Sequence, residues 1–167
     1  MVNSAPYIQD EQLLRLLTSV SDPEIPVLSI MDMGVVRSVE QVGQKVKVKI
    51  TPTYSGCPAM DTISDEIKQT LNRAGYETEV ELVLSPAWTT DWLTEKGRQQ
   101  LADYGIAPPL AETGDKLALL HGEKIVPCTR CGSKNTRMLS QFGSTACKAL
   151  FQCNDCLEPF DYFKCLR

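Results

Sequence analysis

The chain has 167 residues, 43% of them hydrophobic, and a formal net charge of −4. A net negative charge gives no overall attraction to the phosphate backbones of nucleic acids, so we expect no nucleic-acid partner. No apolar run approaches the roughly 20 residues of a membrane-spanning helix, and seven cysteines without an N-terminal signal run do not suit a secreted, disulfide-linked protein. We therefore expect a cytoplasmic protein with no membrane contact, reduced thiols, one core and a small satellite domain.

The first predicted elements are a helix and a β-hairpin. Asp10 can cap a helix over residues 11–20, where apolar residues recur at helical spacing, and the proline-rich segment 22–26 ends it. The runs 35–39 and 46–50 then flank a glycine turn. Because lysine alternates with valine or isoleucine in the second run, we expect one buried and one solvated face.

A second helix and a third strand complete the predicted core. Apolar residues recur every three or four positions over residues 58–74, Pro58 suits the first helical position, and Gly75 suits a left-handed terminator. The alternating segment 79–84 predicts a third strand. The order helix, strand, strand, helix, strand predicts an α+β fold, a small open sheet with helices on one face. A further helix is expected up to residue 104, with Thr90 as its cap and Gly97 as a weak point.

Four cysteines near the C-terminus form two Cys-x-x-Cys pairs, Cys128 with Cys131 and Cys153 with Cys156. Four thiolates in two such turns make a tetrahedral metal site, for which zinc is the default ion. Iron held in a rubredoxin-like manner is the alternative. The 21 residues between the pairs slightly exceed the usual spacing but suit a zinc ribbon of two hairpins.

These elements divide the chain into three parts. Glycines and scattered charges separate the sheet domain from the ribbon, which predicts a linker. Segments 149–151 and 160–163 predict neighbouring strands within the ribbon. The expected limits are 1–109 for the α+β domain, 110–126 for the linker and 127–167 for the zinc ribbon.

Cys57 directly precedes Pro58 at the predicted start of the second helix. We expect Cys57 to cap this helix, with its sulfur near unpaired amides and the positive end of the helix dipole, which lowers the pKa of a thiol. Cys57 is therefore a candidate nucleophile or soft-metal ligand. The alternative is a half-buried cysteine that only fills space.

Two more thiols, Cys147 and Cys165, flank the predicted ribbon strands and could meet across a sheet. The simpler interpretation is a pair of buried thiols beside the ribbon. The alternative is a labile site at which Cys57, Cys147 and Cys165 together receive iron or a transient iron–sulfur cluster. Asp22 should hold its proline-rich loop through local hydrogen bonds, and a metal or partner role for it stays open.

Three motifs carry a family resemblance. They are Asp22-Pro23-Glu24-Ile25-Pro26-Val27, Asp32-Met33-Gly34-Val35-Val36, and Thr53 followed four positions later by Cys57-Pro58. Over roughly residues 10–84 the chain resembles the metal–sulfur cluster assembly domain family, whose members assist iron–sulfur protein maturation. The resemblance implies that Cys57 is the family's thiol and Asp22 its acidic loop residue.

Later motifs are more specific. They include Ser85-Pro86-Ala87-Trp88, Tyr104-Gly105-Ile106-Ala107-Pro108-Pro109 and Phe142-Gly143-Ser144-Thr145-Ala146-Cys147. With them, nearly the whole chain resembles the D-component family of phenylacetyl-CoA epoxidase systems. This implies an accessory protein of phenylacetate catabolism that helps to mature the iron–sulfur cluster or metal centre of a partner, which would be an oxygenase or reductase component of the epoxidase complex.

The residues themselves disfavour an enzyme. A carboxylate-bridged di-iron site needs two Glu-x-x-His pairs, and the single histidine is His121. Neither a dinucleotide-binding nor a phosphate-loop glycine motif occurs. A non-catalytic zinc-ribbon adaptor of the oxygenase complex is the main alternative. A nucleic-acid-binding zinc ribbon is a weaker alternative, because the net charge of the chain is negative. Formation of a homodimer through paired strands stays open.

Overall fold

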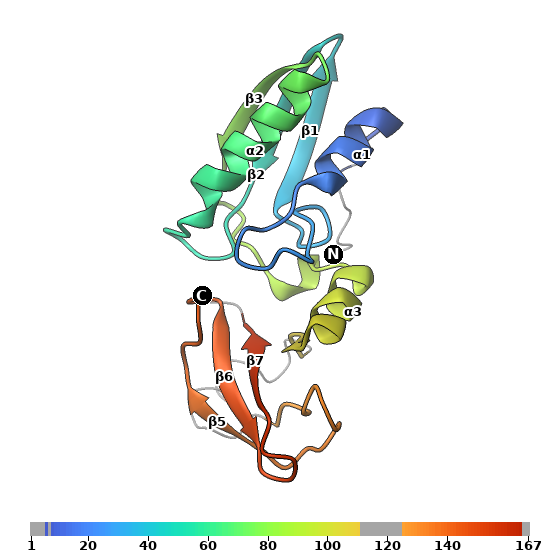
Figure 1. The fold of residues 1–167 in the computed structure, drawn as a ribbon. Coiled ribbons are helices and arrows are strands. Elements are labelled where there is room, and N and C mark those ends of the chain that lie inside the picture. Colours follow the sequence, from blue (N-terminus) through green and yellow to red (C-terminus); the bar gives the residue numbers. More distant parts are fainter. Residues whose placement is uncertain (1–5, 7, 111–124, 165–167) are drawn as a thin grey trace. The chain divides into compact units, whose positions relative to one another are not determined.

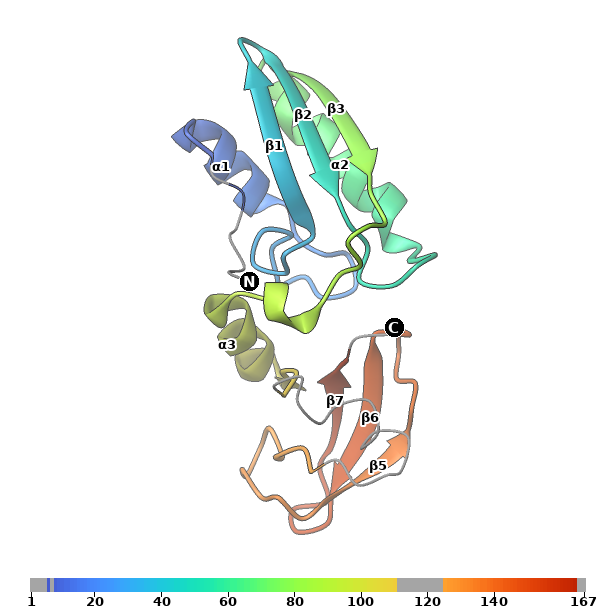
Figure 2. The ribbon, with the colours of Figure 1, turned by 180° about the vertical axis from the view of Figure 1, so that it is seen from behind.

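The computed structural model describes residues 6, 8–110 and 125–164 of the chain. The chain forms two compact units, residues 1–97 and residues 98–167 (Figures 1 and 2). The predicted domain limits at residues 109 and 127 stay predictions. Within the described ranges, no helix combines the length and the apolar character that crossing a membrane requires.

The first unit combines two helices with a three-stranded sheet. Its elements are α1 (Glu11–Ser19), β1 (Val36–Val42), β2 (Lys45–Ile50), α2 (Ala59–Arg73) and β3 (Glu77–Leu82). The strands lie in the order β1-β2-β3, with β1 antiparallel and β3 parallel to β2. Helix α2 lies along one face of the sheet, in front of the strands in Figure 1 and behind them in Figure 2, and α1 packs against α2. The predicted α+β order is confirmed.

Local sequence signals explain where these elements begin and end. The side chain of Asp10 accepts hydrogen bonds from the amides of Gln12 and Leu13, so it caps α1 as predicted. Gly75 follows the end of α2 with φ +94°, a left-handed backbone that glycine adopts without a steric penalty. The third strand begins two residues earlier than expected, because the turn at Gly75 leads directly into its pairing with β2.

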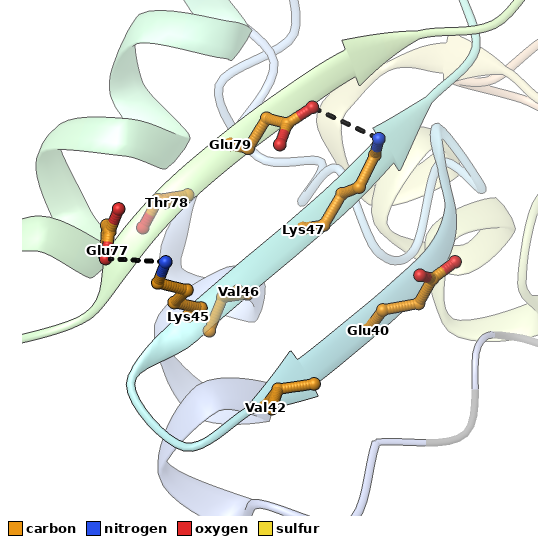
Figure 3. A pocket seen from close by; sticks show the side chains of 8 residues that line it. All are labelled: Glu40, Val42, Lys45, Val46, Lys47, Glu77, Thr78 and Glu79. Atoms are coloured by element: carbon orange, nitrogen blue, oxygen red, sulfur yellow. Dashed lines mark ion pairs between the residues drawn. The ribbon is translucent and has the colours of Figure 1, made fainter.

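The two faces of the sheet differ as the alternation in β2 predicts. Val46, Val48 and Ile50 are buried, and the lysines between them pair with glutamates of the neighbouring strands. Figure 3 shows two of these pairs beside an open hollow of about 330 Å³. The lysines therefore face carboxylates and form a solvated face. The ion pairs are Lys45 with Glu77 (3.9 Å), Lys47 with Glu79 (3.1 Å) and Glu81 (2.9 Å), and Lys49 with Glu40 (3.4 Å).

The predicted single helix up to residue 104 is wrong. The chain forms a 3-10 turn, η1 (Thr90–Trp92), and then α3 (Glu95–Tyr104). The side chain of Thr89, not that of Thr90, caps η1. The Oγ1 of Thr94 accepts the amide of Gly97 at 3.0 Å and so starts a second helix. Threonine hydroxyls that bond the backbone locally compete with a continuous helix, which explains the break.

Gly97 marks a close approach between segments rather than a weak point. A Cβ atom at this position would lie 2.9 Å from the carbonyl oxygen of Asp32 and 3.1 Å from a methyl group of Leu28. The carboxylate of Asp32 is fixed by hydrogen bonds from the hydroxyls of Thr94 (2.9 Å) and Ser29 (3.0 Å). A Cβ atom at position 97 would therefore be too close to the backbone of Asp32 unless one of the two segments moved.

The second unit is built on a four-stranded sheet with the order β4-β7-β6-β5. Its strands are β4 (Ile106–Ala107), β5 (Thr136–Ser140), β6 (Lys148–Cys153) and β7 (Pro159–Phe163). Strands β6 and β7 confirm the two predicted ribbon strands. The two-residue strand β4, which pairs in parallel with β7, was not expected. Most of the predicted linker, with His121, lies outside the described residues.

Candidate metal centre and thiol site

The four cysteines of the two Cys-x-x-Cys pairs converge on one point. Their Sγ atoms all lie within 4.8 Å of one another. The Sγ of Cys128 lies 3.7 Å from that of Cys156, and the Sγ of Cys131 lies 3.6 Å from that of Cys153. Tetrahedral zinc with bonds of about 2.3 Å requires sulfur atoms about 3.8 Å apart. The residues therefore fit zinc, and four protein ligands leave no position open for water or substrate.

Backbone amides are directed at the sulfur atoms from both turns. The amide of Arg130 donates to the Sγ of Cys128 (3.4 Å), and the amide of Cys156 donates to the Sγ of Cys153 (3.5 Å). The amide of Cys156 lowers the pKa of Cys153 to about 7. The amide of Ser133 acts in the same direction on Cys131, but the neighbouring sulfurs outweigh it and raise that pKa to about 12. Without a cation, the thiol of Cys131 therefore stays protonated at neutral pH.

The metal site is continuous with the core of the second unit. Cys128 and Cys153 are buried and belong to the cluster formed with Val126 and Phe151, whereas Cys131 is exposed and Cys156 half-buried. A bound ion would therefore hold the two turns together next to this core. This is the arrangement of a structural zinc site, in which metal binding contributes to folding.

Cys57 lies in the turn before α2, but it does not cap the helix. Pro58 occupies the N-cap position with helical backbone angles and no capping side chain, so the predicted N-cap role of Cys57 is wrong. The carbonyl oxygen of Cys57 accepts the amide of Met60, at 3.3 Å, and the amide of Cys57 donates to the carbonyl of Tyr54, at 3.2 Å. The side chain is half-buried, in a tight turn.

The predicted fall in the pKa of Cys57 is also wrong. Burial raises the pKa of this thiol, the amide of Ala59 and the hydroxyl of Tyr54 lower it in part, and the charges of Glu24 and Asp22 raise it further. The start of α2 does not lower the pKa of Cys57 overall, because desolvation and the charges of two carboxylates raise this pKa by more than the hydrogen bonds lower it.

Asp22 holds the loop that brings these carboxylates to Cys57. Its Oδ1 accepts hydrogen bonds from the amides of Glu24 and Ile25, both at 2.8 Å, and the side chain is buried. The predicted local hydrogen bonds of Asp22 are therefore confirmed. The influence of Glu24 on the thiol was not predicted, and so short an acidic loop gave no signal of where it would fold.

The other predicted thiols are only partly described. Cys147 is buried, and its Sγ lies 3.1 Å from the Oγ1 of Thr145. Cys165 lies outside the described residues. Because Cys57 and Cys147 belong to different compact units, a site shared by these thiols stays a prediction.

Two family models divide the chain between them. A model described as an iron-sulfur cluster assembly protein matches residues 10–83, which include Asp22 and Cys57. A model described as a PaaD zinc beta ribbon domain matches residues 112–164, which include the four converging cysteines. In the solved structures, a domain of unknown function, DUF59, from Bacillus anthracis has a TM-score of 0.50 and 28% identity, covering 54% of this chain and 88% of that chain.

Two relatives match the chain over different shares of its length. An Fe-S protein maturation auxiliary factor of Porphyromonas gingivalis is 31% identical over 55% of this chain and 90% of its own length. The Escherichia coli (strain K12) protein provisionally named as the D component of 1,2-phenylacetyl-CoA epoxidase is 46% identical over 95% of this chain and 94% of its own. Since this similarity spans both units, the chain belongs to the family of phenylacetyl-CoA epoxidase D components.

Proposed function

We propose that the chain is a non-catalytic maturation factor of a multicomponent phenylacetyl-CoA ring epoxidase. In this proposal it assists iron–sulfur cluster or metal-centre assembly in an oxygenase or reductase component. The observation that carries it is the similarity to the Escherichia coli relative over 95% of this chain. A relative named as an Fe-S protein maturation auxiliary factor, and the iron-sulfur cluster assembly model that matches residues 10–83 with Cys57 among them, support it.

The two thiol sites have the properties that two different roles require. Four sulfurs at tetrahedral spacing supply a complete ligand set, which supports a resident zinc ion. Cys57 is one half-buried thiol, whereas stable iron–sulfur clusters need several protein ligands. Cys57 therefore suits transient contact with a cluster that passes to a partner. Cys147 and Cys165 remain candidates for additional ligands in that transfer.

The carboxylates near Cys57 give the transfer site a preference for cations. Glu24 and Asp22 disfavour the thiolate while the site is empty, because like charges repel. Iron offsets this repulsion when it binds, and the thiol proton leaves to solvent or to a carboxylate at the same time. The site thereby couples ionisation of Cys57 to the arrival of its cargo. In this proposal Asp22 fixes the loop, and Glu24 supplies charge.

The test is replacement of the cellular copy of this chain by its Cys57→Ser variant. We expect the partner proteins purified from those cells to lack most of their iron and the ring-epoxidase activity to fall about tenfold or more, while the variant keeps one zinc per chain. Thr62→Ser, at an exposed position of α2 in the same unit, is the matched control and should leave activity and partner iron unchanged.

An adaptor without metal transfer is the second candidate. The raised pKa of Cys57 favours it, because a protonated thiol is a weak ligand until cargo displaces the proton. An adaptor would dock its oxygenase or reductase partner normally with serine at position 57. Full iron content and full activity in the Cys57→Ser cells would therefore replace the maturation proposal by the adaptor.

A further inference from the structure

The two metal-binding turns are joined by a set of side chains that do not touch the metal position. Ser133 and Asn135 follow the first turn, and Asn154 and Asp155 lie between the ligands of the second. The carboxylate of Asp155 accepts hydrogen bonds from the hydroxyl of Ser133 and from the side-chain amide of Asn135, the latter at 2.7 Å. We call these four residues the clasp.

Further hydrogen bonds, some of them from main-chain amides, connect the clasp residues. The side-chain amide of Asn154 donates to the Oδ1 of Asn135 at 2.9 Å, and the main-chain amide of Asn154 donates to the carbonyl oxygen of Asn135 at 2.8 Å. The amide of Asn135 in turn donates to the hydroxyl of Ser133 at 3.0 Å. The register of the β5–β6 pair, with Thr136 opposite Cys153, brings the two segments together.

The same residues also present backbone donors to the ligand sulfurs. The amide of Ser133 is hydrogen-bonded to Cys131, and the amide of Asp155 is hydrogen-bonded to Cys153. These two sulfurs come from different turns and lie 3.6 Å apart. A hydrogen bond between the side chains of Ser133 and Asp155 therefore fixes one N–H donor on each turn at once. Outer partners that orient ligands in this way strengthen metal binding.

We propose that Ser133, Asn135 and Asp155 are positioning residues for the metal centre and that they make the bound zinc slow to leave. The clasp holds the two turns at the spacing that zinc requires and keeps amides on Cys131 and Cys153. The second unit thus retains its own ion while iron is handled elsewhere on the chain. Zinc retention by the clasp does not depend on the role of Cys57.

The test measures zinc release from the full-length zinc-loaded chain to a chromogenic chelator in excess. We expect Asp155→Ala and Ser133→Ala to release zinc about 10- to 100-fold faster than the unchanged chain. Ser133→Thr, which keeps a hydroxyl, should restore slow release. Lys134→Ala is the matched control, because Lys134 lies exposed between the clasp residues and its side chain takes no part in the clasp.

A second readout separates positioning from a general loss of stability. In cobalt-substituted protein, main-chain N–H donors that move away from the sulfurs leave the thiolates as stronger electron donors. The thiolate-to-cobalt absorption band should therefore move to longer wavelength in Asp155→Ala but not in Lys134→Ala. Release within twofold of the unchanged chain in both alanine variants, with an unmoved cobalt band, would overturn the proposal. Equal acceleration in Lys134→Ala would overturn it too.

Discussion

The Sγ of Cys131 lies 3.6 Å from the Sγ of Cys153, although 22 positions separate the two residues in the chain. Without a shared cation, two thiols at this distance are not easily ionised at the same time, because two neighbouring thiolates repel each other. The amide of Cys156 favours ionisation of Cys153, whose pKa falls to about 7, while the pKa of Cys131 rises to about 12. A divalent ion bound between the sulfurs offsets the repulsion between the thiolates. The second unit should therefore depend on its metal for folding.

Removing one ligand of the metal site tests that dependence. Cys131→Ser should lose the zinc and, with it, the ordered ribbon, because structural zinc contributes about 10 kcal/mol or more to the folding of small zinc domains. The measurement is zinc content by elemental analysis together with proteolysis of the second unit. Thr145→Val, beside a buried thiol outside the four converging sulfurs, should keep one zinc and resist proteolysis. A protease-resistant, zinc-free Cys131→Ser protein would show that the metal is not structural.

The raised pKa of Cys57 predicts slow alkylation. At mildly alkaline pH, less of this thiol is ionised than of an unperturbed cysteine, so its reaction with iodoacetamide should be slower and should keep accelerating as the pH rises further. Since the folded state holds the proton more tightly than the unfolded chain, the stability that this thiol contributes is present at neutral pH and is lost as the pH rises through its folded pKa.

Glu24→Gln tests the electrostatic part of this shift. Removing one nearby negative charge should lower the pKa of Cys57 and speed its alkylation, as followed by mass spectrometry of the peptide that contains it. Glu66→Gln, on the exposed face of α2, is the control and should leave the rate unchanged. Identical rates in Glu24→Gln and Glu66→Gln would mean that burial alone sets the reactivity.

Gly97→Ala sets two effects of known size against each other. Alanine in a helix is favoured over glycine by about 1 kcal/mol. The added Cβ would meet the carbonyl oxygen of Asp32 at 2.9 Å, and overpacking of this kind costs about 1–3 kcal/mol. Because the obstacle is backbone, we expect net destabilisation, seen as a lower urea midpoint. A raised midpoint would show that α3 can move away.

The metal site could be predicted from the sequence because its geometry is local. Each Cys-x-x-Cys turn fixes two sulfurs over four residues, and only the meeting of the two turns needs the fold. Cys57 shows the opposite case. The helix start after it was readable, but its pKa depends on a loop more than thirty positions earlier that places Asp22 and Glu24 nearby. Sequence spacing carries no information about that approach.

The fold shows the same contrast. Helices α1 and α2, the three strands of the first unit, and strands β6 and β7 follow sequence patterns that repeat over several residues, so a single exception does not hide the pattern. Strand β4 has two residues and exists only because β7 lies beside it, so no pattern could predict it. The break between η1 and α3 depends on single side chains, the hydroxyl of Thr94 and the missing Cβ of Gly97.

In the proposed function, the chain keeps a resident zinc at four cysteines and handles iron separately at Cys57. The test is anaerobic incubation of the zinc-loaded chain with ferrous iron and sulfide, with an absorption spectrum recorded while the iron is present and elemental analysis of zinc afterwards. We predict that the unchanged chain develops a thiolate-to-iron band and keeps its one zinc, and that Cys57→Ser keeps the zinc but develops no such band. Iron that displaces the zinc, or an equally strong band in Cys57→Ser, would show that the two metals are not handled at separate sites.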